Sequence, residues 1–329
     1  VMLQTGSYGR KQGAVDVGGD VTADGRLSYR FAGMMQDTET QTDFTERRRV
    51  AAAPSLTWKP ADGTSLTLIG LYQRDDFDGS PRNVLPAPGT LLYNPNGKLP
   101  TSFSMSDPNF NEWDRKTQSI GYRFEHRFDD HWAVRQNARY LHNDLSYKGL
   151  YAGGLLADQR TMRRNAFSLR ERADDLTIDN QVQADFDTGP LHHTVLAGVD
   201  HQRLKSDTVR GLASAPNLDL FNPVYGLSIA DPPIYQSIAT RVTQTGVYGQ
   251  DQITWGGLTV LLGGRKDWAE TQQRNRRTQA SGSQKDDAFT GRAGVLYLFG
   301  NGLAPYASYS ESFEPAVGSD YGGNAFEPT

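Results

Sequence analysis

The chain has 329 residues, of which 37% are hydrophobic, 10% aromatic and 22% charged, and its formal net charge at pH 7 is -4. Because it contains no cysteine, disulfide bonds and thiolate metal sites are excluded, and its dispersed lysines and arginines form no basic stripe for nucleic acid. No apolar run is long enough for a transmembrane helix, and no change in composition marks a boundary between two soluble domains.

Apolar and polar residues alternate with a period of two along much of the chain, which predicts β-strands with one apolar and one polar face. In chain order, the clearest segments are residues 27–33, 49–58, 120–128 and 176–186, followed by a hairpin over 292–310. We therefore predict an all-β protein built from antiparallel hairpins. Three polar residues fall on otherwise apolar faces, namely His126, Gln136 and Asn180.

The connections between these strands alternate between short and long. Short turns are predicted around residues 24–25, 60–63, 129–130, 187–190, 256–257 and 300–302, and long irregular segments over about 75–116, 148–173, 205–240 and 270–286. Short turns at one end and long loops at the other are the signature of an outer-membrane β-barrel, whereas a soluble domain seldom carries four such loops. Six aromatic residues beside the short turns are expected to form the girdle at one membrane interface: Trp58, Phe128, Trp132, Phe186, Trp255 and Phe299.

In such a barrel the apolar face of each strand meets lipid and the polar face lines a lumen, while backbone groups pair between strands. The alternative, a large soluble β-sandwich or propeller, would carry loops of similar length at both ends. The polar faces carry a basic set that we expect to line the lumen: Arg49, Arg123, Arg127, Arg135 and Arg139.

Several blocks of the sequence also resemble a known family. They include "APSLTWKPADGTSLTLIGLYQRDD", "LPAPGTLLYNPNGKLPTSF", "GYRFEHRFDDHWAVRQNARY", "TIDNQVQADFDTGPLHHTVLAGVDHQR", "TQTGVYGQDQITW" and "APYASYSESFEPAVGSDYGGNAFEPT". Together they resemble TonB-dependent siderophore receptors, in particular the ferric hydroxamate (ferrichrome) receptor branch, in matching order over essentially the whole chain. The resemblance implies a 22-stranded barrel in the bacterial outer membrane, a plug domain, and transport energised through TonB.

Measured against that family, residues 1–329 are expected to be a partial barrel domain. We count about 12 strands and expect the plug, the TonB-engaging segment and the C-terminal strands to be absent from this chain. The chain should then form a curved, open antiparallel sheet. Its edges should lie near residues 1–10 and at the strand beginning with Leu303.

Siderophore sites are mostly aromatic with a few placed polar groups. In receptors that this chain resembles, such residues lie at the outer ends of strands and in the long loops. Here that implies Tyr93, Tyr151, Phe221 and Tyr225 as ligand contacts, with packing in the rim or loops as the alternative. Arg82 precedes the "LPAPGT" block where the family carries aromatic residues, so it is expected either to pair with an anionic siderophore or to be solvated.

The sequence gives little support for catalysis or for a metal site. No nucleophile motif is present and no histidine has a partner at metal-site spacing, so neither a catalytic nor a metal site is predicted. Iron is expected as part of the ferric siderophore ligand, not as a cofactor. A passive porin and an outer-membrane phospholipase remain alternatives. Further expected partners are outer-membrane lipid and lipopolysaccharide, with phage or colicins as candidates for binding the loops.

Overall fold

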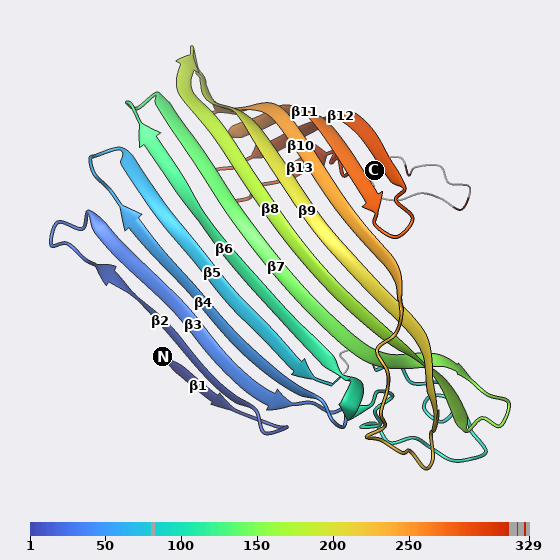
Figure 1. Cartoon of the computed structure of the whole chain (residues 1–329). Coiled ribbons are helices and arrows are strands. Elements are labelled where there is room, and N and C mark those ends of the chain that lie inside the picture. Colours follow the sequence, from blue (N-terminus) through green and yellow to red (C-terminus); the bar gives the residue numbers. More distant parts are fainter. Residues whose placement is uncertain (80–82, 316–320, 322–325, 327–329) are drawn as a thin grey trace.

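A computed structural model describes residues 1–79, 83–315, 321 and 326 (Figure 1). In these residues thirteen antiparallel strands form one sheet in sequence order, so each described strand pairs with its neighbours along the chain. No helix in the described residues is long and apolar enough to cross a membrane. The strands are β1 (Met2–Thr5), β2 (Lys11–Asp20), β3 (Leu27–Glu39), β4 (Glu46–Trp58), β5 (Thr64–Asp78), β6 (Glu112–Arg127), β7 (Trp132–Leu155), β8 (Thr161–Thr188), β9 (Leu191–Asp219), β10 (Ile234–Trp255), β11 (Leu258–Asn275), β12 (Ser281–Tyr297) and β13 (Tyr306–Ser310), with one 3-10 turn, η1 (Pro108–Phe110).

The sheet is curved and open. In Figure 1 the strands β10 to β13 curl behind β7 to β9, and β1 and β13 are the two edges. This confirms the prediction of an open antiparallel sheet with its edges near the two ends of the chain. It contains thirteen strands where the sequence suggested about 12.

Two of the predicted long loops are wrong, and a third is wrong in part. Residues 148–173 form a paired extension of β7 and β8 around a turn at 156–160, and 270–286 form an extension of β11 and β12. Within 205–240 only 220–233 lies outside the strands, whereas 79–111 is a long connection as predicted. The sequence did not predict these extensions, because a strand beyond the membrane needs no apolar face. Strand pairing therefore continues where the period-two alternation ends.

The opposite end of the sheet has the short turns that the sequence predicted. Gly63 illustrates why these turns need particular residues. Its φ is 76°, and a Cβ at this position would lie 2.8 Å from the carbonyl oxygen of Arg127. Glycine therefore suits this position on both counts.

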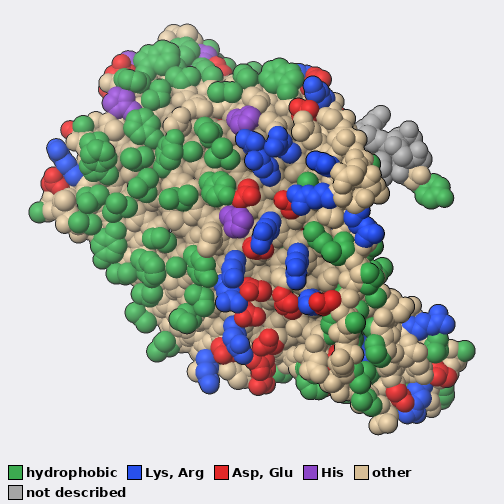
Figure 2. All heavy atoms as spheres, in the orientation of Figure 1, with side chains coloured by type: hydrophobic (Ala, Val, Ile, Leu, Met, Phe, Trp, Pro, Cys, Tyr) green, Lys and Arg blue, Asp and Glu red, His purple; other side chains and the backbone are tan. Residues whose placement is uncertain are grey.

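Register places the apolar residues of neighbouring strands on one face of the sheet. Leu68 of β5 lies opposite Leu56 of β4 and Tyr122 of β6, which belong to the apolar faces predicted over 49–58 and 120–128, so Leu68 lies on the same face. Leu68 is nevertheless 47% exposed. Figure 2 shows hydrophobic side chains over the part of the convex face nearest the short turns, and a charged band between them and the long loops. An apolar surface of this extent needs lipid or protein to cover it.

The girdle aromatics lie at the short-turn margin of this apolar band and are all exposed. Trp58, for example, ends β4, and Trp132 begins β7. This arrangement agrees with an aromatic collar at one membrane interface.

The three polar residues on the apolar face hydrogen-bond to neighbouring side chains. The Tyr122 hydroxyl lies 2.6 Å from Oε1 of Gln136, and Nε2 of Gln136 lies 2.6 Å from Oδ1 of Asn180. His126 Nδ1 lies 2.8 Å from the Thr64 hydroxyl. Because lipid offers no hydrogen bonds, these partners allow polar groups on this face.

The other face of the sheet carries the predicted basic set. Arg135 and Arg127 approach Glu125 at 3.4 and 3.6 Å, and Arg49 pairs with Asp75. These residues alternate with apolar neighbours, so they lie on the concave face, as expected for residues that line a lumen.

Candidate functional site

The long connections form a compact body at one end of the sheet. Six residues make its apolar core: Leu99, Phe103 and Met105 from the 79–111 connection, Met162 from β8, Leu218 from β9, and Leu220. Polar contacts join the three connections. The side-chain amide of Asn94 donates to the carbonyl oxygen of Gln159 (2.8 Å), and Asp107 accepts from the backbone N–H of Gly226 (3.2 Å). The 79–111 connection is therefore tied to both of its neighbours.

A buried arginine joins this body to β8. Arg164 is 1% exposed and donates from Nε to the carbonyl oxygen of Pro216 at 2.9 Å. Burial lowers the pKa of its guanidinium, with Asp107 acting in the opposite direction. Nearby, the Tyr225 hydroxyl donates to the Ser104 carbonyl oxygen at 2.8 Å, and burial raises the pKa of Tyr225 to about 12. These contacts stabilise the loops.

An aromatic row crosses the concave face just below this loop body. Trp113 on β6 lies 6.1 Å from Phe77 on β5 and 5.5 Å from Tyr147 on β7, measured between ring centroids. Phe167 on β8 then lies 5.9 Å from Tyr147 and 6.3 Å from Tyr151. We call these five residues the aromatic ladder.

Strand register explains the aromatic ladder. Phe77 lies directly opposite Trp113, and Trp113 directly opposite Tyr147, so their side chains leave the same face of the sheet. Edge-to-face and tilted aromatic pairs of this kind are favourable beyond their buried area. A row of rings with few polar groups is the surface that binds the organic part of a small ligand.

Charged residues cluster at the β4 to β6 end of the aromatic ladder. Asp75 is 1% exposed and accepts from Arg49, from Arg115 (3.0 Å) and from Gln73 (2.7 Å). Arg47 lies over the Phe77 ring, with its guanidinium carbon 5.3 Å from the centroid. The ladder therefore ends beside three guanidinium groups and one carboxylate.

The candidate residues from the sequence fall in different places. Tyr151 belongs to the aromatic ladder, and burial raises the pKa of its hydroxyl. Phe221 and Tyr225 come together instead in the loop body, where both pack against its apolar core. Tyr93 is 86% exposed and makes no ring contact or hydrogen bond within the described part of the chain. Arg82 lies outside the described residues.

Sequence reasoning missed four members of the ladder. Each is an aromatic residue at a position where the strand's alternation calls for a polar, lumen-facing side chain, and each stands near the outer end of its strand. An aromatic residue at a lumen-facing position is therefore the sequence feature that could have identified them. The four are Phe77, Trp113, Tyr147 and Phe167.

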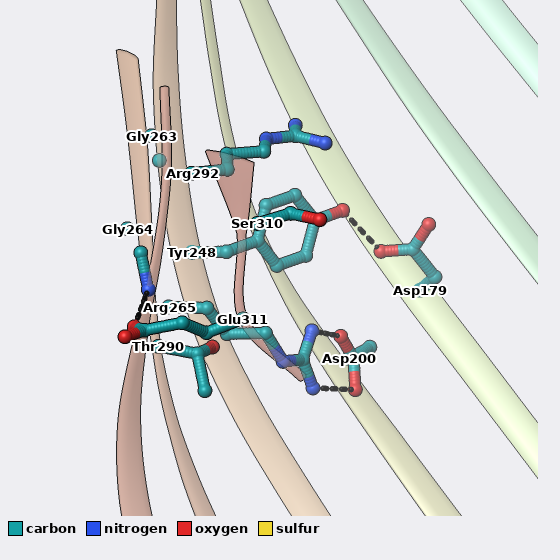
Figure 3. A pocket seen from close by; sticks show the side chains of 12 residues that line it. Asp179, Asp200, Tyr248, Gly263, Gly264, Arg265, Thr290, Arg292, Ser310 and Glu311 are labelled. Carbon is teal, nitrogen blue, oxygen red and sulfur yellow. Dashed lines mark hydrogen bonds and ion pairs between the residues drawn. The ribbon is translucent and has the colours of Figure 1, made fainter. Parts of the chain in front are cut away.

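A polar cluster lies on the wall of the lumen formed by β8 to β12 (Figure 3). The Tyr248 hydroxyl donates to Asp179 at 2.7 Å, and Arg265 pairs with both Asp200 and Asp267. Glycine makes room for it, because a Cβ at Gly246 would lie 1.9 Å from a guanidinium nitrogen of Arg265. The cluster is internally paired and lines a hollow of about 430 Å³.

In the residues that the structure describes, no three histidines or carboxylates are grouped to hold an ion. The aromatic ladder instead offers ring faces and a few charged groups, which suit a ligand that brings its own shell of donors around a metal.

Comparison with known proteins gives this architecture a family. A family model described as "TonB dependent receptor-like, beta-barrel" matches residues 54–329. The ferrichrome outer membrane transporter/phage receptor of Escherichia coli (strain K12) is 36% identical over 361 residues, covering 100% of this chain and 47% of the relative. The ferrioxamine B receptor of Salmonella typhimurium (strain SL1344) is 34% identical over 328 residues, covering 100% of this chain and 46% of the relative.

Solved structures agree at the level of the fold. The ferripyoverdine receptor of the outer membrane of Pseudomonas aeruginosa superposes with a TM-score of 0.84 at 20% identity, covering 99% of this chain and 44% of that one. This chain spans about half the length of the curated relatives it matches. The matched family model and the 34% and 36% identities across the whole chain show that it belongs to the TonB-dependent receptors, as part of their outer-membrane β-barrel.

Proposed function

We propose that the complete protein is an outer-membrane receptor and transporter for ferric siderophores of the hydroxamate type, energised through TonB. The observation that carries this proposal is the aromatic ladder, which faces the lumen of a barrel whose relatives are named for ferrichrome and ferrioxamine. Contact with TonB would be made by a region of the protein outside these 329 residues.

In this proposal the aromatic ladder contacts the organic shell of the chelate. Trp113 and Tyr151, both half-buried, offer ring faces and one hydroxyl group near the mouth of the lumen, and the buried Tyr147 (4% exposed) packs against Trp113. Because iron stays inside the chelate, no acid, base, nucleophile or resident cofactor is needed, and the protein acts as a receptor, not an enzyme. Tyr93, Phe221, Tyr225 and Arg82 are proposed as further contacts, reached when loops and ligand approach each other.

The surface suggests the remaining partners. Lipid would cover the apolar band, and lipopolysaccharide would meet the charged band beside it (Figure 2). That band contains pairs such as Arg74 with Asp114 at 2.8 Å and His142 with Asp174 at 2.8 Å. Phage or bacteriocins would bind the loop body. This is supported by the E. coli relative, which is named a phage receptor, and by a structural neighbour solved as a complex with pyocin S2.

The test is uptake of radioactive iron as a ferric trihydroxamate by cells that carry or lack the gene for the full-length protein. We expect uptake only in cells with the gene, and its loss when an uncoupler removes the proton-motive force. Unchanged uptake after deletion would refute the proposal. Uptake that needs the gene but resists the uncoupler would favour the passive porin instead.

A further inference from the structure

The aromatic ladder is flanked by unequal charge. At its β4 to β6 end stand Arg47, Arg49 and Arg115, and the carboxylate of Asp75 is the negative charge that pairs with them. At its β8 end, Glu171 accepts from the Thr208 hydroxyl (3.3 Å) and Arg210 on β9 donates to Gln236 (2.9 Å), so charges of both signs occur on these strands. Within the described residues, the ladder therefore has an excess of positive charge at one end.

Arg47 is the guanidinium in this group that lacks an anionic partner. Arg49 and Arg115 both bind Asp75, whereas the side chain of Arg47 makes no hydrogen bond or ion pair with any described residue. Its Nε is buried without a hydrogen-bond partner, and its guanidinium is placed by the Phe77 ring. A charged group held in one place with unsatisfied donors is suited to a ligand that supplies acceptors.

Strand geometry determines which face of the sheet the Arg47 side chain occupies. Arg47 lies opposite Phe77 and two residues from Arg49 on β4, so it leaves the lumenal face beside the first ring of the ladder. A chelate lying on the rings would place its periphery next to Arg47. A cationic group would be repelled there, whereas a carboxylate would accept two parallel N–H bonds from one guanidinium.

We infer that this receptor prefers ferric hydroxamates that carry a free anionic group, and that Arg47 is the residue that contacts this group. The inference rests on the proposed siderophore function and narrows it to a class of ligand. Neither hydroxamate relative is named for an anionic chelate, and one is named for ferrioxamine B, whose free group is an ammonium.

The test uses three ferric chelates with one common trihydroxamate core. These are ferrioxamine B, which ends in an ammonium group, its N-acetyl derivative, which is neutral, and its N-succinyl derivative, which ends in a carboxylate. Equilibrium binding to the purified full-length receptor is followed by quenching of tryptophan fluorescence. We expect the succinyl form to bind about tenfold more tightly than the ammonium form, the worth of one charge-assisted hydrogen bond.

Variants assign this preference to a residue. In Arg47→Gln the three chelates should bind within about twofold of one another, and Arg47→Lys should keep part of the preference because it keeps the charge but not the planar fork. Arg48→Gln is the matched control. It is the next residue on β4, it faces the opposite side of the sheet, and it pairs with Glu46 at 2.9 Å. Arg48→Gln should leave the order of the three chelates unchanged.

Each outcome decides a separate point. Equal binding of the three chelates by the parent receptor, or tightest binding of the ammonium form, would overturn the charge preference. An unchanged preference in Arg47→Gln would overturn the role of Arg47. Failure of all three chelates to bind would refute the proposed siderophore function itself, and with it this inference.

Discussion

Arginine substitutions at Leu68 and at Thr67 should separate the two faces of the sheet. The two residues are adjacent on β5 and point to opposite faces. Leu68 belongs to the exposed apolar band, whereas Thr67 hydrogen-bonds the Thr57 hydroxyl at 2.9 Å on the lumenal face. The same charge is thus placed in lipid at one position and in the lumen at the next.

The expected magnitudes follow from depth. At ~3.3 Å per residue, Leu68 lies about 13 Å along β5 from Thr64, where the strand begins, and about 20 Å from Arg74, where charge first appears on its outward face. For a strand tilted by roughly 40°, this places Leu68 near the middle of an apolar band about 25 Å tall. Leu68→Arg should therefore cost ~2 to 4 kcal/mol. Thr67→Arg should cost about 1 kcal/mol, the worth of the lost hydrogen bond.

The assay is reversible denaturant unfolding of the full-length receptor from lipid vesicles, with the midpoint and slope measured for each variant. Val182 and Gln183 on β8 provide a second pair, with Val182 39% exposed and Gln183 bonded to Asp185. Equal costs at Leu68 and Thr67, or a larger cost at Thr67, would show that the lipid and lumen faces are wrongly assigned.

Two further predictions concern particular contacts. Gln136→Leu should destabilise the receptor by about 1 to 3 kcal/mol although leucine is more apolar, because it leaves the Tyr122 hydroxyl and the Asn180 amide unpaired in lipid. Replacing Gln136, Tyr122 and Asn180 together by apolar residues should recover most of that loss. Unfolding measurements on both variants test this, and an unchanged stability in Gln136→Leu would contradict it. Because the pKa of Tyr225 is raised from 10.0 to about 12, its contribution to loop stability is present below pH 10 and is lost as the pH rises through about 12. The difference in tyrosinate absorbance between the parent and Tyr225→Phe isolates this titration, and a midpoint near 10 would show that Tyr225 is not buried in the loop body.

The sequence predicted the membrane-spanning part of the sheet because lipid imposes a strict rule on it. Along β5 and β8 every second residue must be apolar where the strand crosses the band, so positions such as Leu68 and Val182 reveal both strand and face. The rule ends at the membrane surface. Residues 161–173 of β8 carry charges on both faces, so a paired strand there looked like a loop.

The candidate site was harder to predict than the fold. Tyr151 was found because its surroundings resemble the family, but it joins Trp113 and Phe167 only through the register of β6, β7 and β8. Register over such a distance is fixed by pairing of whole strands, which no local pattern records. Phe221 and Tyr225 were selected by residue type, and their burial in the loop body depends on the path of the 79–111 connection.

Whether the aromatic ladder binds the ligand is tested by measuring the binding of a ferric trihydroxamate to the full-length receptor and to its Trp113→Ala variant. Trp113 stands at the second position of the aromatic ladder and contacts rings on both sides. Trp58→Ala is the matched control, because Trp58 lies on the outer girdle at the short-turn end. If the ladder binds the ligand, Trp113→Ala should weaken affinity by about tenfold or more while Trp58→Ala leaves it unchanged. Unchanged affinity in both Trp113→Ala and Tyr151→Ala would contradict a binding role for the aromatic ladder and would show that the ligand binds elsewhere.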